Sequence, residues 1–236
     1  MSKTVIISGA AGGLGRAVVE SFLKADYQVV ALTQLGLPDQ VKFLEERFKD
    51  NGKLEIVPMD VTREEEVGRN MEVWEKKYGH VDAVVSLVGG FMMGDLEATD
   101  EASIDKMVFL NFKTAFHLAK QGYSVMKRNK GGRIVLVSAR GAFDINAAHG
   151  SVAYSISKGM VKHLAEIINE SGRKHNVRCS TVVPNIIDTP LNRKAMPDAD
   201  FDKWVKAEQI GEVIRFACDQ ENDFLAEPVY KVYGEY

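Results

Sequence analysis

Short apolar runs alternate with longer amphipathic segments along the whole chain. The apolar runs lack the strict apolar–polar alternation of a half-exposed strand, so they are typical of parallel strands buried on both faces. The segments between them repeat apolar residues at helical spacing. Strands are expected at Val5–Ile7, Val29–Leu32, Leu54–Val57, Val81–Leu87, Arg133–Val137, Val177–Val183 and Pro228–Val232, and helices at Leu14–Lys24, Pro38–Asp50, Arg63–Tyr78, Ser103–Lys127, Val152–Ser171 and Asp202–Asp219.

Strands that alternate with helices in this way form right-handed βαβ units. The expected fold class is therefore α/β, a single Rossmann-like doubly wound parallel sheet of about seven strands with helices on both faces. No Pro/Gly/Ser-rich linker, internal repeat or low-complexity tract interrupts the pattern. We expect one domain over residues 1–236.

Composition narrows the class of protein further. The chain is 45% apolar and 27% charged, as in an ordinary globular protein. Its net charge of −3 is spread along the chain and favours neither nucleic acid nor an anionic membrane surface as a partner. No stretch is long enough to span a membrane, and the N-terminal apolar run is too short for a signal peptide, so a cytoplasmic location is expected. Cys179 and Cys218 are expected to be buried thiols, with one disulfide as the alternative.

A glycine-rich segment follows the first expected strand and opens the first helix. Gly9 would permit a tight turn, Gly13 would let the backbone approach a pyrophosphate, and Gly15 would allow close helix–strand packing. The free N–H groups of the helix start would then face the phosphates. The alternative interpretation is that these residues form a glycine-rich turn that binds no ligand.

The end of the second strand bears on which dinucleotide binds. A carboxylate there usually holds the ribose hydroxyls of NAD and excludes the 2′-phosphate of NADP. Here the strand ends Leu32-Thr33-Gln34, with neither an acidic nor a basic side chain. The cofactor is expected to be NADP or NAD, and the missing carboxylate slightly favours NADP.

A tyrosine and a lysine stand four residues apart near the start of an expected helix, at Tyr154 and Lys158. Residues at this spacing share one helix face. A tyrosine has a pKa of about 10, too high for efficient acid–base chemistry at pH 7. A neighbouring ammonium group stabilises the phenolate, so Lys158 is expected to lower the pKa of Tyr154.

Taken together, the glycine loop, Asp60-Val61, Asn111, Ser138 and the Tyr154/Lys158 pair resemble the short-chain dehydrogenase/reductase family, in the family's order and over essentially the whole chain. The resemblance implies that Tyr154 is the acid/base, that Lys158 lowers its pKa and binds the nicotinamide ribose, that Ser138 holds the substrate oxygen, and that Asn111 helps to hold a proton-relay water. It implies cofactor contacts at Gly9, Gly13, Leu14, Gly15, Thr33, Asp60, Val61, Val88, Gly89, Tyr154, Lys158, Pro184, Ile187 and Thr189.

The chain also departs from the family pattern. The paired asparagines after the fourth strand are replaced by Ser86 and Leu87, and Ser138 precedes Tyr154 by 16 residues, a few more than usual. The segment from Asp188 to Trp204 resembles dihydropteridine reductases, a branch of the family, as does the aromatic Phe91 after two glycines. That branch prefers NADH through an aspartate where this chain has Thr33, and lacks the serine found here at 138.

A serine that holds an oxygen is needed for a ketone more than for a conjugated pterin. Ser138 therefore favours a small-molecule carbonyl or alcohol substrate, with reduction of a quinonoid pterin or a non-catalytic NAD(P)-sensing protein as alternatives. We expect no metal, and a homodimer or homotetramer on the resemblance to the family. The expected substrate pocket contains Phe91, Phe143, Met196 and Trp204.

Overall fold

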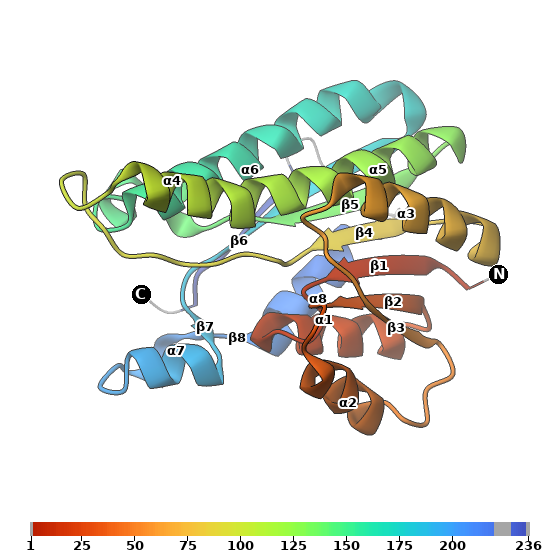
Figure 1. Cartoon of the computed structure of the whole chain (residues 1–236), viewed down its shortest axis with the longest axis horizontal. Coiled ribbons are helices and arrows are strands. Elements are labelled where there is room, and N and C mark those ends of the chain that lie inside the picture. The colour runs from red at the N-terminus through yellow and green to blue at the C-terminus, as the bar shows by residue number, and fades with distance from the viewer. Residues whose placement is uncertain (1, 220–227, 235–236) are drawn as a thin grey trace.

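The protein is described by a computed structural model, in which residues 2–219 and 228–234 are placed. Its centre is a parallel seven-stranded sheet with strand order β3-β2-β1-β4-β5-β6-β9 (Figure 1). The expected α/β fold with a doubly wound parallel sheet is confirmed. The strands are β1 (Thr4–Ser8), β2 (Gln28–Thr33), β3 (Leu54–Pro58), β4 (Ala83–Ser86), β5 (Gly132–Val137), β6 (Val177–Pro184) and β9 (Val229–Val232).

Helices cover both faces of this sheet (Figure 1). One face carries α3 (Glu64–Tyr78), α5 (Thr114–Arg128) and α6 (Val152–Gly172), and the other carries α1 (Gly13–Lys24) and α8 (Ala207–Ala217). The remaining helices are α2 (Pro38–Arg47), α4 (Glu101–Met107) and α7 (Pro190–Ala195).

The apolar runs of the strands supply both cores at once. Successive side chains of a strand point to opposite faces of the sheet. Ile6 of β1 accordingly packs into the core beneath α3, α5 and α6, whereas Val5 and Ile7 pack into the core beneath α1 and α8. A strand buried on both faces is apolar at most positions, which explains the lack of alternation in the sequence.

From β1 the chain adds β2 and β3 on one side of the sheet, and it then adds β4, β5 and β6 on the other side, so the strand order switches between β1 and β4. In open α/β sheets this switch leaves a crevice outside the carboxyl ends of the two strands, where ligands bind. The loops after β1, β4 and β5 meet near this crevice and contain the glycine loop, Gly89 and Ser138.

Two expected helices differ from the structure by more than a few end residues, whereas Pro38–Asp50 ends three residues earlier than expected, at Arg47. Ser103–Lys127 is interrupted by a π-helical turn (Val108–Lys113) between α4 and α5. The last expected helix begins at Ala207, five residues later than predicted, because the residues before it form a 3₁₀ turn and the short strand β8 (Val205–Lys206), which pairs with β7 (Ile187–Asp188). Neither short strand nor α7 was predicted from the sequence, since two-residue strands and a six-residue helix are too short to show a periodic pattern.

Cys179 and Cys218 are both buried and free, as expected. Among the placed residues, no helix has the length and apolar character needed to cross a membrane. Within residues 2–219 and 228–234, no group of three or more His, Cys, Asp or Glu side chains is arranged to hold a metal ion.

Candidate active site

The glycine loop between β1 and α1 has room for backbone only. Gly9 has a φ of 68°, a conformation that side chains disfavour. A Cβ at Gly15 would overlap the carbonyl oxygen of Gly9, and one at Gly13 would lie 2.8 Å from Cγ2 of Thr189. Leu14, between these two glycines, packs against the core beneath α1 and α8. The loop thus presents a bare backbone at a helix start, which fits a pyrophosphate.

The expected adenosine contacts lie at the ends of β2 and β3. The Met59 N–H donates to the Thr33 carbonyl across 3.0 Å, which brings Asp60 and Val61 beside the end of β2. Asp60 accepts hydrogen bonds from the hydroxyl and the N–H of Thr62, and these bonds lower the pKa of its carboxyl. The Thr33 hydroxyl is buried and has no hydrogen-bond partner in the structure. An unpartnered buried hydroxyl at this point is suited to a polar ligand atom.

Tyr154 and Lys158 lie one turn apart on α6, close to its N-terminus. The ring of Phe91 meets the ring of Tyr154 edge to face, with centroids 4.9 Å apart. Lys158 is buried, and its ammonium group donates to the Val137 carbonyl at 2.9 Å. Burial is the physical cause of both pKa shifts: it raises the pKa of Tyr154 to about 12 and lowers that of Lys158 to about 8.

The pKa of Tyr154 therefore shifts in the direction opposite to the expected one. The sequence spacing predicted a phenol beside an ammonium group, whereas the Lys158 ammonium hydrogen-bonds a carbonyl and the cost of burying a phenolate dominates. A phenol with a pKa of about 12 is protonated at pH 7. It is in the right form to donate a proton.

Asn111 lies in the π-helical turn and is buried. Its side-chain amide accepts from the N–H of Gly90 at 2.8 Å and donates to the Ser157 hydroxyl at 2.9 Å. The Ser157 hydroxyl in turn donates to the Tyr154 carbonyl at 2.7 Å. Asn111 therefore connects the loop after β4 with the helix that holds Tyr154 and Lys158.

Ser157 was missed by the sequence analysis. Its only signal is a polar residue on the inward face of α6, where it is fully buried between Tyr154 and Lys158. A buried hydroxyl needs partners, but the sequence does not show which ones.

Gly89, in the loop after β4, lies directly against this cluster. A Cβ at this position would lie 2.6 Å from Oδ1 of Asn111 and 3.2 Å from Nζ of Lys158. Val88, the residue before it, is partly buried against the core beneath α3, α5 and α6. The loop after β4 thus reaches the expected nicotinamide end with only backbone next to Lys158.

Ser138 directly follows β5, but its hydroxyl hydrogen-bonds the backbone of α6 and does not face the expected substrate. The Ser138 hydroxyl donates to the Lys158 carbonyl at 2.8 Å, and only 1% of the residue is exposed. A group that holds a substrate oxygen must direct a donor at that oxygen. This geometry argues against the expected role, because the Ser138 proton is directed at the backbone of α6. The next residue, Ala139, has no hydroxyl to replace it.

The segment after β6 approaches the glycine loop from the other side. Pro184 ends β6, Ile187 begins β7, and Thr189 caps α7 by accepting from the N–H of Asn192 at 3.2 Å. The close approach of Thr189 to Gly13 places this segment at the expected nicotinamide end.

Asp188, beside Thr189, anchors α7 to the rest of the protein. It forms ion pairs with Arg193 and Lys206, which hold the pKa of its carboxyl well below its usual range. Because Arg193 belongs to α7 and Lys206 to β8, these pairs fix the helix at the edge of the crevice.

The four expected substrate-pocket residues are in different settings. Phe91 is 62% exposed beside Tyr154, and Phe143 and Met196 are partly buried. Trp204 is buried and packs on Phe201, with ring centroids 4.8 Å apart, and the Phe201 ring in turn lies 4.6 Å from the guanidinium of Arg193 on α7, so Trp204 lies behind α7 and does not line an open pocket.

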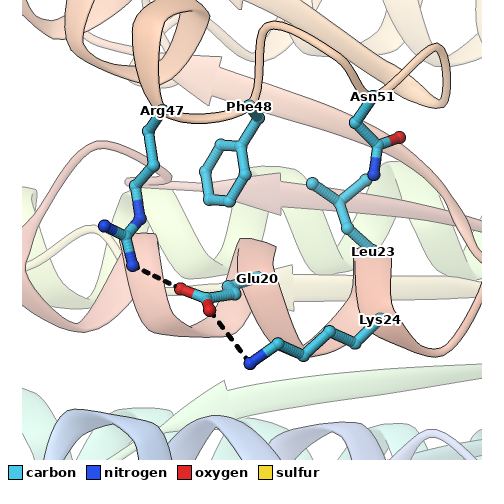
Figure 2. A pocket seen from close by; sticks show the side chains of 6 residues that line it. All are labelled: Glu20, Leu23, Lys24, Arg47, Phe48 and Asn51. Carbon is cyan, nitrogen blue, oxygen red and sulfur yellow. Dashed lines mark hydrogen bonds and ion pairs between the residues drawn. The ribbon is translucent and has the colours of Figure 1, made fainter.

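A surface cavity of about 360 Å³ lies between α1 and the end of α2, on the face of the sheet opposite α6 (Figure 2). It has no part in the site around Tyr154. Its lining residues are Glu20, Leu23, Lys24, Arg47, Phe48 and Asn51.

The doubly wound sheet, the bare glycine loop and the Tyr154/Lys158 pair define an NAD(P)-dependent oxidoreductase. The chain belongs to the short chain dehydrogenase family, whose model matches residues 3–200. It is 30% identical to dihydropteridine reductase of Dictyostelium discoideum over 216 residues, 90% of this chain and 86% of the relative. It is 26% identical to D-beta-hydroxybutyrate dehydrogenase of Rhizobium meliloti over 215 residues, 89% of this chain and 81% of the relative.

Solved structures agree on the fold. The structure described as "ElxO with NADP Bound" superposes with a TM-score of 0.90 at 23% sequence identity, covering 99% of this chain and 98% of that one.

Proposed function

We propose that this protein reduces a small molecule with NAD(P)H and that Tyr154 donates the proton. The cofactor supplies the hydride, and its pyrophosphate would lie at the glycine loop. Tyr154 enters the reaction as a neutral phenol, since burial raises its pKa to about 12. Lys158, one turn along α6, holds its ammonium group against the Val137 carbonyl and would bind the nicotinamide ribose. Asn111 and Ser157 hold the backbone around Tyr154 in place.

We propose further that the acceptor is a planar, conjugated ring of the quinonoid dihydropterin type. The observation that carries this choice is the buried hydrogen bond from Ser138 to the Lys158 carbonyl, which directs the Ser138 proton away from a ketone oxygen. A conjugated ring spreads the incoming charge over its own atoms and needs only the hydride and one proton. Phe91, exposed beside Tyr154, offers a face for such a ring. The 30% identity to a dihydropteridine reductase supports the same choice.

Reduction of a simple carbonyl compound is the second candidate. The relationship to D-beta-hydroxybutyrate dehydrogenase supports it, but the geometry of Ser138 does not. Cofactor binding without turnover is a third possibility, and Tyr154 and Lys158 argue against it. A cytoplasmic location and assembly into a homodimer or homotetramer remain predictions.

The test is oxidation of NADPH and NADH by a panel of quinonoid dihydropterin, quinones and ketones. We expect kcat/KM to be highest for the quinonoid acceptors, and Ser138→Ala to keep turnover close to that of the wild type. A higher kcat/KM for ketones, together with a loss of kcat/KM of about 100-fold or more in Ser138→Ala, would establish that the substrate is a carbonyl compound. Binding of the cofactor with no turnover across the panel would establish a sensor.

A further inference from the structure

Arg16 occupies an unusual place on the first turn of α1. Its Nε donates to the Ala11 carbonyl of the glycine loop at 2.8 Å, and its guanidinium carbon lies 3.6 Å from the centroid of the Phe43 ring on α2. The side chain is therefore held between the glycine loop and α2. The two terminal nitrogens of Arg16 donate no hydrogen bond to any of the described residues.

The charge of Arg16 is not balanced by the protein. Within the described part of the chain, no carboxylate lies within ion-pair distance of its guanidinium. Glu20, one turn further along α1, pairs with Lys24 and Arg47 instead (Figure 2). Partial burial, and then the nearby Arg47, lower the pKa of Arg16. The Arg16 guanidinium is therefore available to pair with an anion.

The neighbourhood of Arg16 is the adenosine end of the expected cofactor site. The N–H of Ala10 donates to the Leu32 carbonyl at 3.2 Å, which joins the glycine loop to the end of β2. The side chain of Gln40 on α2 accepts from the N–H of Gln34 at 3.2 Å, which joins α2 to the same point. The buried Thr33 hydroxyl, which has no partner, lies at this strand end, and residues 33–37 have no charged side chain.

We propose that Arg16 is the residue that selects NADPH over NADH, by binding the 2′-phosphate of the adenosine ribose, with the Thr33 hydroxyl as a second donor. The proposal rests on the proposed use of a nicotinamide dinucleotide. A guanidinium fixed against Phe43 keeps its planar donors in one orientation, as a phosphate requires. The missing carboxylate at the end of β2 removes the group that would repel this phosphate.

The test compares two adenosine fragments that differ only in the 2′-phosphate. Adenosine 2′,5′-bisphosphate and 5′-AMP are titrated into the wild type, Arg16→Met and Arg47→Met by calorimetry. In Arg16→Met, we expect the bisphosphate to bind about 10- to 100-fold more weakly, with an unchanged affinity for 5′-AMP. Arg47→Met is the matched control, because Arg47 is already paired with Glu20. It should bind both fragments as the wild type does.

Each outcome has one meaning. Unchanged bisphosphate affinity in Arg16→Met, or equal affinity of the wild type for the two fragments, would overturn the role of Arg16 and leave the proposed reductase intact. Retained binding of 5′-AMP by Arg16→Met shows that the variant is folded. Failure of the wild type to bind either fragment would overturn the proposed use of a dinucleotide, and the role of Arg16 with it.

Discussion

Lys158 is expected to make the stability of this protein depend on pH in an unusual direction. Its pKa falls from 10.5 in an exposed lysine to about 8 in the folded chain, because burial penalises the ammonium form. Between these two values the unfolded chain holds a proton that the folded chain has released. The contribution of Lys158 to the free energy of unfolding therefore rises with pH from about 8 to 10.5 and is constant below this window.

The size of the effect follows from the shift. One pKa unit corresponds to about 1.4 kcal/mol, so a shift from 10.5 to about 8 amounts to about 3.5 kcal/mol, of which about 3 kcal/mol falls between pH 7 and pH 10.5. Other buried groups act in the opposite direction, since burial raises the pKa of Cys179, Cys218 and Tyr27. These contributions cancel when the wild type is compared with a Lys158→Met variant at each pH.

Urea unfolding of both proteins at pH 7 and at pH 10.5 measures this difference. The free energy of unfolding of the wild type, relative to Lys158→Met, should increase by about 3 kcal/mol between the two pH values. Lys162, one turn further along α6, is partly exposed and paired with Glu166, so Lys162→Met is the matched control and should follow the wild type. A difference between the wild type and Lys158→Met that does not change with pH would refute the reasoning.

Three further variants test the site. Tyr154→Phe should lower kcat by about 100-fold or more while the Kd for the cofactor stays close to the wild-type value, measured by steady-state kinetics and fluorescence titration. Gly15→Ala should lose about 1–3 kcal/mol of stability in urea unfolding, because its Cβ would overlap the Gly9 carbonyl oxygen, whereas Gly52→Ala, in open space, should not. Ser157→Ala should lower kcat severalfold without changing the cofactor KM, since it removes the link between Asn111 and Tyr154.

Different results would contradict each of these expectations. Wild-type turnover in Tyr154→Phe would remove the proton donor from the mechanism. Equal stability of Gly15→Ala and Gly52→Ala would show that the glycine loop can relax. A raised cofactor KM with unchanged kcat in Ser157→Ala would place Ser157 in cofactor binding, away from the support of Tyr154.

The sheet was predictable from sequence because a strand buried on both faces leaves a continuous apolar run, as in β1 and β6. The glycine loop was predictable because only glycine tolerates the Gly9 turn and the Gly15 contact. The hydrogen-bond partners of individual side chains could not be predicted from the sequence. The spacing of Ser138 from Tyr154 said nothing about the direction of its hydroxyl, which depends on how α6 packs beside β5. The pKa of Tyr154 depends on burial, which spacing does not reveal.

The π-helical turn that contains Asn111 restricts how this region can change in length. A π turn holds one more residue than an α-helical turn, so deleting any one residue of Val108–Lys113 would let the helix become continuous. The two flanking helices would keep their relative orientation, because the π turn accommodates the extra residue that the deletion removes. The turn itself would tighten, and the amide of Asn111 would move away from the Gly90 N–H and the Ser157 hydroxyl. Sequences that share this site should therefore keep the length of the segment between α4 and α5.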